Sequence, residues 1–217
     1  MKRTLNNPKI KLANQNTINE NSISTEFGIH KRKPIKKGEI SILIASASDT
    51  GKEREILLNK LYRQYKIQGY EESTKHRILT YGWEDLATQN GHPQDIVNNH
   101  ILPKVDVVIA VLKHTLGTPI FEKNGNVRNE SGVAEEIYYA LKDSNQGPLC
   151  MLYVNNTPIS IAPHDPELEI KFRNLIAINK FVTKLKNKIL YKQYYSEDEL
   201  LPKALFDLAQ NISTFFL

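Results

Sequence analysis

Short β-type runs of apolar residues alternate along this chain with longer segments in which apolar residues recur at helical spacing. Five strands are predicted, at residues 40–46, 78–83, 105–112, 149–154 and 189–194. Helices are predicted between and after them, at residues 50–65, 94–102, 131–143, 167–186 and 196–215. This alternation is typical of a parallel sheet with helices on both faces. Because crossovers between parallel strands are right-handed, the simplest remaining topology is a doubly wound, five-stranded, flavodoxin-like α/β fold.

Local signals refine this prediction at three places. Residues 105–112 are almost wholly apolar, which is typical of a strand buried on both faces. Thr50, with Glu53 three residues later, predicts a capping box at the start of the first helix. Residues 113–130 predict a long polar loop, which is a candidate lid or interaction surface.

The first 39 residues differ from the rest of the chain in composition and charge. They are rich in Asn, Ser, Thr and Lys, and they carry nine basic and three acidic residues, a net charge of +6. The remaining 178 residues carry 20 basic and 21 acidic residues and sum to −1. A segment with so few large apolar groups cannot offset the entropy cost of ordering it. We therefore expect a flexible basic leader at 1–39 and one domain at 40–217.

The overall composition limits the class of protein. Of the 217 residues, 40% are hydrophobic and 24% charged, as in ordinary globular proteins. Since the positive charge lies in the leader, a nucleic-acid partner is expected only through that segment. Basic clusters such as the one at residues 31–37 are more often solvated linkers. The single cysteine, Cys150, excludes an internal disulfide and fits a reducing cytosol.

No segment predicts insertion into a membrane or secretion. The most apolar run, residues 105–112, is far too short to cross a bilayer. The N-terminus has charge but lacks the apolar core of a signal peptide. We expect a soluble cytoplasmic protein.

Ligands of doubly wound sheets bind in the loops at the carboxyl ends of the strands. The first such loop contains Ser46, Ser48 and Asp49 and leads into the helix that carries Arg54. Gly51-Lys52 is similar to part of a phosphate loop, but the upstream glycine and the following Ser or Thr are missing, which excludes a P-loop ATPase. Small residues before a helix can bind an anion or a ribose, and plain helix capping explains them equally well.

The helix predicted after the third strand carries two candidate carboxylates. Val133, Ile137 and Ala140 define its buried face. Glu135 is then expected to point into solvent, whereas Glu136 lies at the edge of the buried face. A carboxylate at that edge could bind ribose hydroxyls or stabilise an oxocarbenium cation. A carboxylate that only complements the helix dipole is the alternative.

Other chemistry has less support in the sequence. Trp83, the only tryptophan, follows the second predicted strand and could stack on a base or a nicotinamide, although partly buried packing is commoner. The histidines do not show metal-ligand spacing, so no metal site is expected. The chain has no G-x-S-x-G elbow for a nucleophilic hydrolase.

Five stretches resemble a bacterial TIR-like domain of unknown function, which also occurs at the N-terminus of some NTPase and repeat-containing signalling proteins. The matching stretches are ILIASASD at 42–49 with Glu53-Arg54, VDVVI at 105–109, LGTP at 116–119, SGVAEEI at 131–137 and PLCMLY at 148–153. Their order and spacing cover the whole predicted domain. The family is similar in fold to TIR domains and to nucleoside 2-deoxyribosyltransferases.

This resemblance implies that N-glycosidic bonds are cut or exchanged with the help of a glutamate. The deoxyribosyltransferase pattern has a Gly four residues before the catalytic Glu and an Ala four residues after it, which here are Gly132, Glu136 and Ala140. The chain departs from the family at Val133, where Thr is common, so a hydroxyl near the substrate is missing. The helical periodicity and the resemblance select the same carboxylate.

The leading hypothesis is that the protein is a nucleotide N-glycosidase, which consumes NAD⁺ in a bacterial stress or antiphage response. No further cofactor is expected. The protein is expected to act as a homo-oligomer or together with a partner signalling protein. Glu136 is the expected catalytic residue, and the expected substrate contacts are Ser46, Ser48, Asp49, Arg54, Trp83 and Ser131. One alternative is a non-catalytic module that binds a nucleotide messenger or a partner protein. A third is a nucleoside deoxyribosyltransferase.

Overall fold

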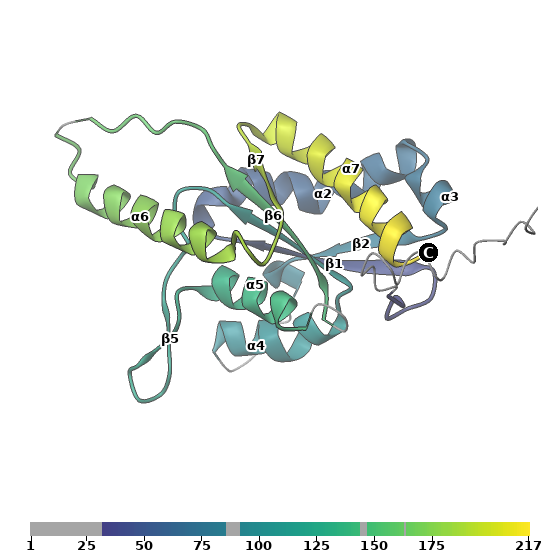
Figure 1. Cartoon of the computed structure of the whole chain (residues 1–217), viewed down its shortest axis with the longest axis horizontal. Coiled ribbons are helices and arrows are strands. Elements are labelled where there is room, and N and C mark those ends of the chain that lie inside the picture. Colours follow the sequence, from purple (N-terminus) through teal and green to yellow (C-terminus); the bar gives the residue numbers. More distant parts are fainter. Residues whose placement is uncertain (1–31, 86–91, 144–146, 163) are drawn as a thin grey trace, which may run out of the picture. The chain divides into compact units, whose positions relative to one another are not determined.

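Five parallel strands form one sheet in the order β2-β1-β3-β6-β7 (Figure 1). The strands are β1 (Glu39–Ser46), β2 (Arg77–Tyr81), β3 (Val107–Leu112), β6 (Leu149–Asn155) and β7 (Tyr191–Tyr194). The computed structural model describes residues 32–85, 92–143, 147–162 and 164–217. The predicted flavodoxin-like α/β fold is confirmed.

Helices cover both faces of the sheet, as predicted (Figure 1). One face packs against α2 (Gly51–Ile67) and α7 (Glu197–Phe215), and the other against α4 (Pro93–His100), α5 (Gly132–Lys142) and α6 (Leu168–Leu185). Successive residues of β1 alternate between the two cores, because side chains of a strand point to opposite faces. All six residues of β3 are buried, as expected for the central strand.

The strand order places a topological switch point between β1 and β3. The chain runs from β1 outward to β2 and then returns across β1 to β3. Both strands therefore direct the loops at their carboxyl ends into the crevice where ligands of such sheets bind. The loop after β1 contains the 3₁₀ turn η1 (Ser48–Thr50), and the loop after β3 begins at Lys113.

Several predicted strands and helices are shorter in the structure, and β3 begins at Val107, two residues later than predicted. β2 ends at Tyr81 rather than at Trp83, because the N–H of Gly82 donates to Asp85 and the chain turns into the 3₁₀ turn η2 (Trp83–Asp85). β7 begins at Tyr191, two residues later than predicted. α4 ends at His100, and the next residues form the 3₁₀ turn η3 (Leu102–Lys104) around Pro103.

The predicted capping box at the start of α2 is wrong. The hydroxyl of Thr50 donates to the carbonyl of Ala47 at 2.7 Å and makes no cap for the helix. Glu53 does not reach back to the helix start, since its carboxylate is buried against Lys113 and Tyr194. A long-range contact has replaced a local one.

The polar loop predicted at 113–130 contains an antiparallel hairpin of β4 (Ile120–Phe121) and β5 (Val127–Asn129). Its turn includes Asn124 and Gly125, and Gly125 has a φ of +84°, which glycine adopts without strain. A short helix, α3 (Tyr70–Thr74), also lies outside the predicted elements. Both elements are too short for a periodic pattern to reveal them.

Asp106, the residue before β3, bonds both to Ile35, which precedes β1, and to Ser41 of β1. The carboxylate of Asp106 accepts the N–H of Ile35 at 2.8 Å, the N–H of Ser41 at 2.8 Å and the hydroxyl of Ser41 at 2.7 Å. Of the predicted leader, residues 1–31 lie outside the described part of the chain, while residues from Arg32 onward are described with the domain.

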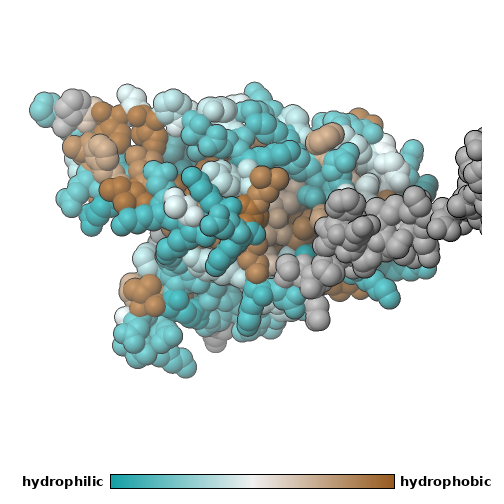
Figure 2. All heavy atoms as spheres, viewed as in Figure 1, coloured by the Kyte–Doolittle hydropathy of each residue, from teal (hydrophilic) through white to brown (hydrophobic). Residues whose placement is uncertain are grey.

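The first half of α6 carries a hydrophobic surface (Figure 2). Ile170, Phe172 and Ile176 are each about half exposed, and the buried residues of this helix begin only at Ile178. A smaller hydrophobic spot lies on the hairpin (Figure 2), where Phe121 and Val127 are exposed. Among the described residues, no helix is both long and apolar enough to span a membrane.

Candidate functional site

Glu136 lies on α5, which begins at the carboxyl edge of the sheet. The helix starts where Ser131 caps it, since the Ser131 hydroxyl oxygen accepts the N–H of Ala134 at 3.1 Å. Glu136 is only 8% exposed, so its carboxyl is more deeply buried than the half-desolvated position predicted. The side-chain amide of Gln94, at the start of α4, donates to Oε1 of Glu136 at 3.2 Å.

Burial changes the acidity of Glu136. Desolvation raises its pKa from 4.5 to about 7, against the opposing effects of the Gln94 hydrogen bond and of the positive charge on Arg54. A carboxyl with this pKa exists in both protonation states near neutral pH. Groups of this kind are enriched at functional sites.

A glycine lets Gln94 lie against the start of α5. A Cβ on Gly132 would stand 2.3 Å from Oε1 of Gln94. Gln94 also donates to Asn98, one turn further along α4, at 3.1 Å. The amide of Gln94 that contacts Glu136 therefore lies between α4 and α5, in a position that is open only because Gly132 has no side chain.

Arg54 connects β1 to the turn after β2. Its Nη1 donates to the carbonyl of Ile44 at 2.9 Å and to the hydroxyl of Ser46 at 3.0 Å. Its Nε and Nη2 donate to the two carboxylate oxygens of Glu84 at 2.8 and 2.7 Å. This ion pair lowers the pKa of Glu84, chiefly through the hydrogen bonds from Arg54. A phosphate that approached Arg54 on this side would have to compete with Glu84.

Trp83 stands beside this ion pair on η2. Its side chain is 62% exposed, and its ring lies 5.8 Å from the guanidinium carbon of Arg54. The ring is thus accessible at the carboxyl edge of the sheet, whereas partly buried packing was the commoner expectation for a tryptophan at this place.

Asp49 joins the two loops at the switch point. Its Oδ2 accepts the N–H of His114 at 2.7 Å and the N–H of Thr115 at 3.0 Å. Its Oδ1 is buried and has no hydrogen-bond partner among the described residues. Gly117 lies in the same loop with a φ of +93°, and a Cβ on it would stand 3.8 Å from the Cβ atoms of Ala47 and Ser131. The loops after β1 and β3 therefore meet the start of α5.

The serines predicted as substrate contacts have different surroundings. Ser48 is exposed on η1. Ser46 is partly exposed and accepts from Arg54. Ser131 is buried, and its hydroxyl oxygen already caps α5. All three lie at the carboxyl edge of the sheet, and Ser48 is the most accessible.

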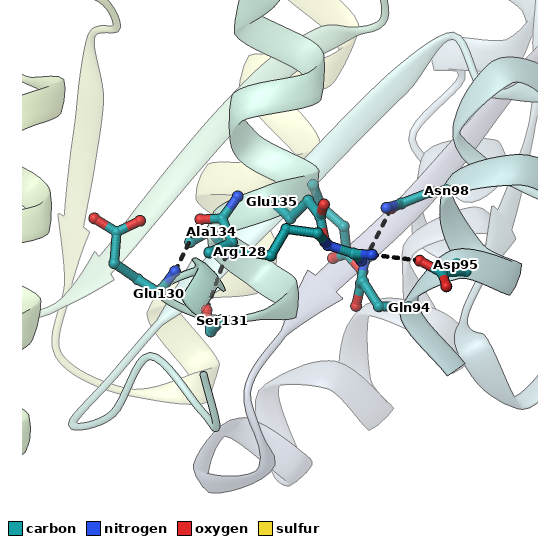
Figure 3. A network of polar contacts seen from close by, with 10 residues as sticks. Gln94, Asp95, Asn98, Arg128, Glu130, Ser131, Ala134 and Glu135 are labelled. Atoms are coloured by element: carbon teal, nitrogen blue, oxygen red, sulfur yellow. Dashed lines mark hydrogen bonds and ion pairs between the residues drawn. The ribbon is translucent and has the colours of Figure 1, made fainter. Parts of the chain in front are cut away.

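Glu135 does not point freely into solvent, as the helical periodicity predicted. Arg128 of β5 reaches over α5 to contact Glu135 at 2.9 Å and Asp95 of α4 at 2.6 Å (Figure 3). The side chain of Glu135 is only partly exposed as a result. Arg128 thereby ties the hairpin to the two helices that position Gln94 and Glu136.

A second buried ionic group lies beneath the switch point. Glu53 of α2 is 1% exposed, and its Oε1 accepts from Lys113 at 2.9 Å and from the hydroxyl of Tyr194 at 3.2 Å. Its Oε2 has no hydrogen-bond partner among the described residues. Burial and the nearby Glu53 charge raise the pKa of Tyr194, so the phenol stays protonated.

A pocket of about 750 Å³ lies along β6 and includes Cys150, whose pKa burial raises to about 12. Its thiol is therefore protonated at neutral pH. In the described part of the chain, no three His, Cys, Asp or Glu residues are placed to hold a metal ion.

The comparisons with known proteins give no family for the chain. Neither the protein-family models nor the curated proteins contain a match. The fold and the site therefore define the protein only as a flavodoxin-like α/β protein with a buried glutamate at the carboxyl edge of its sheet.

The structure brings most of the predicted site residues to one edge of the sheet. Arg54 contacts Ser46 directly, stands beside Trp83 and acts electrostatically on Glu136. The sequence analysis missed Gln94 and Glu84. Their partners lie 42 and 30 residues away in the chain, and no local spacing reveals such a pairing.

Proposed function

We propose that the protein is a nucleotide N-glycosidase and that NAD⁺ is its substrate. The observation that carries this proposal is the buried carboxyl of Glu136, which accepts a hydrogen bond from the side chain of Gln94 at the carboxyl edge of the sheet. A carboxylate in a poorly solvated position stabilises a nearby cation far better than one in water. The ribosyl cation formed when nicotinamide leaves is a cation of this kind.

The proposed reaction is the hydrolysis of one C–N bond. The bond between the ribose C1′ and the nicotinamide nitrogen breaks, and its electron pair goes to the departing nicotinamide. The ionised carboxylate of Glu136 stabilises the oxocarbenium cation that remains. Water adds to C1′ and loses a proton to solvent, which gives ADP-ribose.

The remaining site residues are proposed to hold the nucleotide. Ser46, Ser48 and Asp49 line the ribose and phosphate side, and Ser131 lies at the start of the catalytic helix. Trp83, exposed beside the site, offers a ring for stacking. Arg54 is the proposed partner of a phosphate. No cofactor is needed in this proposal beyond NAD⁺ itself as the substrate.

The biological setting remains a proposal that rests on the resemblance to bacterial TIR-like domains. Such a protein would act in the cytoplasm in stress or antiphage defence. Self-association or a partner signalling protein is proposed to switch it on. The exposed apolar residues of α6, Ile170, Phe172 and Ile176, are the surface we assign to that contact.

NAD⁺ turnover by the full-length chain tests the function directly. We expect release of nicotinamide and ADP-ribose, with the rate per molecule rising with protein concentration if assembly is required. Glu136→Gln keeps the shape and removes the charge, and it should abolish turnover. Glu135→Gln is the matched control on the same helix and should retain it. Turnover that survives Glu136→Gln would disprove the assignment of Glu136.

A binding module without catalysis is the second candidate. It is favoured by Val133, which stands where Thr is common in the family that the chain resembles, so a hydroxyl near the substrate is missing. Thermal stabilisation by NAD⁺ or ADP-ribose without turnover, at any protein concentration, would support this candidate, because a ligand that binds only the native state stabilises it by mass action. Base exchange between nucleosides would instead indicate a deoxyribosyltransferase.

A further inference from the structure

The guanidinium of Arg54 has two hydrogen-bonding edges that are used differently. The Nη1 side is fixed to the end of β1 by the carbonyl of Ile44 and the hydroxyl of Ser46. The other edge, formed by Nε and Nη2, donates to both carboxylate oxygens of Glu84. This second edge is the one through which a guanidinium binds a phosphate or carboxylate with two parallel hydrogen bonds.

The two partners of this ion pair differ in burial. The side chain of Arg54 is 9% exposed, whereas that of Glu84 is 43% exposed. Arg54 is therefore part of the buried structure, and Glu84 lies on the solvent side of its guanidinium. Glu84 can leave by rotation of its own side chain, while Arg54 stays attached to β1. Another anion that arrived from solvent would meet the same pair of donors.

The residue next to the Arg54–Glu84 ion pair is Gly82, which has no side chain. A Cβ on Gly82 would stand 2.2 Å from Oε2 of Glu84 and 2.9 Å from Nη2 of Arg54. The glycine thus leaves room for two carboxylate oxygens to lie flat against the guanidinium edge. The ring of Trp83, on the same turn, presents an aromatic surface next to this position.

We propose that the Nε/Nη2 edge of Arg54 is an anion site for the phosphate group of a nucleotide, and that Glu84 is an internal competitor which the phosphate displaces. This inference rests on the proposed function, in which Arg54 binds a phosphate of the nucleotide, and adds how that phosphate gains access to the guanidinium. It also gives Glu84 a role, which is to occupy the anion site until a phosphate displaces it.

Binding measurements on Glu84→Gln test the inference. The probes are ADP and inorganic phosphate, with adenosine as the uncharged comparison, each titrated into the full-length protein. Removing the competing charge should tighten the binding of ADP and phosphate by up to about fivefold, which is the upper end of the range expected for one partly exposed ion pair. The affinity for adenosine should not change, and Arg54→Gln should abolish the binding of phosphate.

Glu135→Gln is the matched control, because it removes the same charge from a carboxylate that pairs with a different arginine, Arg128. It should leave the affinity for phosphate unchanged. Trp83 is the only tryptophan of the chain, so its fluorescence reports phosphate binding at this place. Glu84→Ala provides a second variant with the same expected gain, should Glu84→Gln fold poorly.

An affinity for ADP that is equal or lower in both Glu84 variants would overturn the inference, as would an equal gain for adenosine or a complete lack of phosphate binding. These outcomes are separate from the test of the glycosidase. If NAD⁺ is not cleaved but Glu84→Gln gains affinity, the proposed catalysis fails and the anion site stands. If NAD⁺ is cleaved and Glu84→Gln gains nothing, only the anion site fails.

Discussion

The side-chain amide of Gln94 lies 3.2 Å from Oε1 of Glu136, and this contact joins the start of one helix to the second turn of another. The donor favours the ionised carboxylate, while burial favours the protonated one. Burial is the larger effect, so the pKa of Glu136 stands at about 7. The chemistry proposed for the site and the stability of the fold both depend on this balance.

Stability should fall as the pH rises through the range in which Glu136 titrates. In the unfolded chain the carboxyl ionises near 4.5, and in the folded protein near 7. Below 4.5 both states are protonated and the group has no effect. Between the two values the unfolded state loses its proton first, so unfolding becomes easier, by about 3 kcal/mol once the pH exceeds 7.

Glu136→Gln removes this dependence and should be more stable than the wild type at pH 8, by up to about 3 kcal/mol, with little difference at pH 4.5. Urea denaturation of both proteins at several pH values measures the difference. Because other groups titrate equally in both proteins, the difference isolates Glu136. A constant difference across pH 5–8 would contradict the raised pKa.

The acid limb of the pH–rate profile should depend on Gln94. If the ionised carboxylate is the active form, turnover should rise about tenfold from pH 6 to pH 8, since the ionised fraction rises by that factor around a pKa of 7. Gln94→Ala removes a hydrogen bond that lowers the pKa of Glu136. The limb should therefore move to higher pH, and the rate at neutral pH should fall.

Gly132→Ala should shift the limb in the same direction without changing Gln94 itself. Its Cβ would stand 2.3 Å from the amide oxygen of Gln94, so the amide must leave the position in which it bonds to Glu136. Gly51→Ala is the matched control, because Gly51 is the first residue of α2 and nothing lies near its added Cβ. A pH profile that moves equally in both glycine variants would show that the effect does not pass through Gln94.

The two partners of the Arg54–Glu84 pair should contribute unequally to stability. Arg54→Gln leaves the carbonyl of Ile44 without its donor and removes a buried group with several hydrogen bonds, which should cost about 2–3 kcal/mol. Glu84→Gln changes a partly exposed side chain and should cost at most about 1 kcal/mol. Urea midpoints of the two variants measure this, and equal losses would show that Glu84 is a structural partner rather than a displaceable one.

The fold was predictable from the sequence because it depends on short-range periodicity. The buried residues Val133, Ile137 and Ala140 follow the helical spacing, so the position of Glu136 beside them could be predicted as well. The helical spacing led to a wrong prediction for Glu135, which was expected to point into solvent. Spacing within one helix does not reveal that Arg128 from a neighbouring hairpin covers this side chain.

The contacts that shape the site could not be predicted for the same reason. Gln94, Glu84 and Lys113 contact partners that are far from them in the sequence, and the topology rather than the spacing brings each pair together. One missed element had a usable signal, because Asn124-Gly125 between Phe121 and Val127 is a strong hairpin sequence. The predicted capping box is wrong because the buried carboxylate of Glu53 pairs with the partly exposed Lys113 instead of the backbone at the helix start.

Asp106 should hold the chain that precedes β1 in place. Its carboxylate accepts three donors from Ile35 and Ser41, so Asp106→Ala leaves two backbone N–H groups without this acceptor and should cost about 2–4 kcal/mol. Hydrogen exchange should accelerate at the amides of Ile35 and Ser41 before it does so in β3. Asp95→Ala is the control, since it removes only one carboxylate of a surface ion pair with Arg128 and should cost less than about 1 kcal/mol. Unchanged protection of Ile35 in Asp106→Ala would mean that other contacts, and not this carboxylate, attach the segment to the sheet.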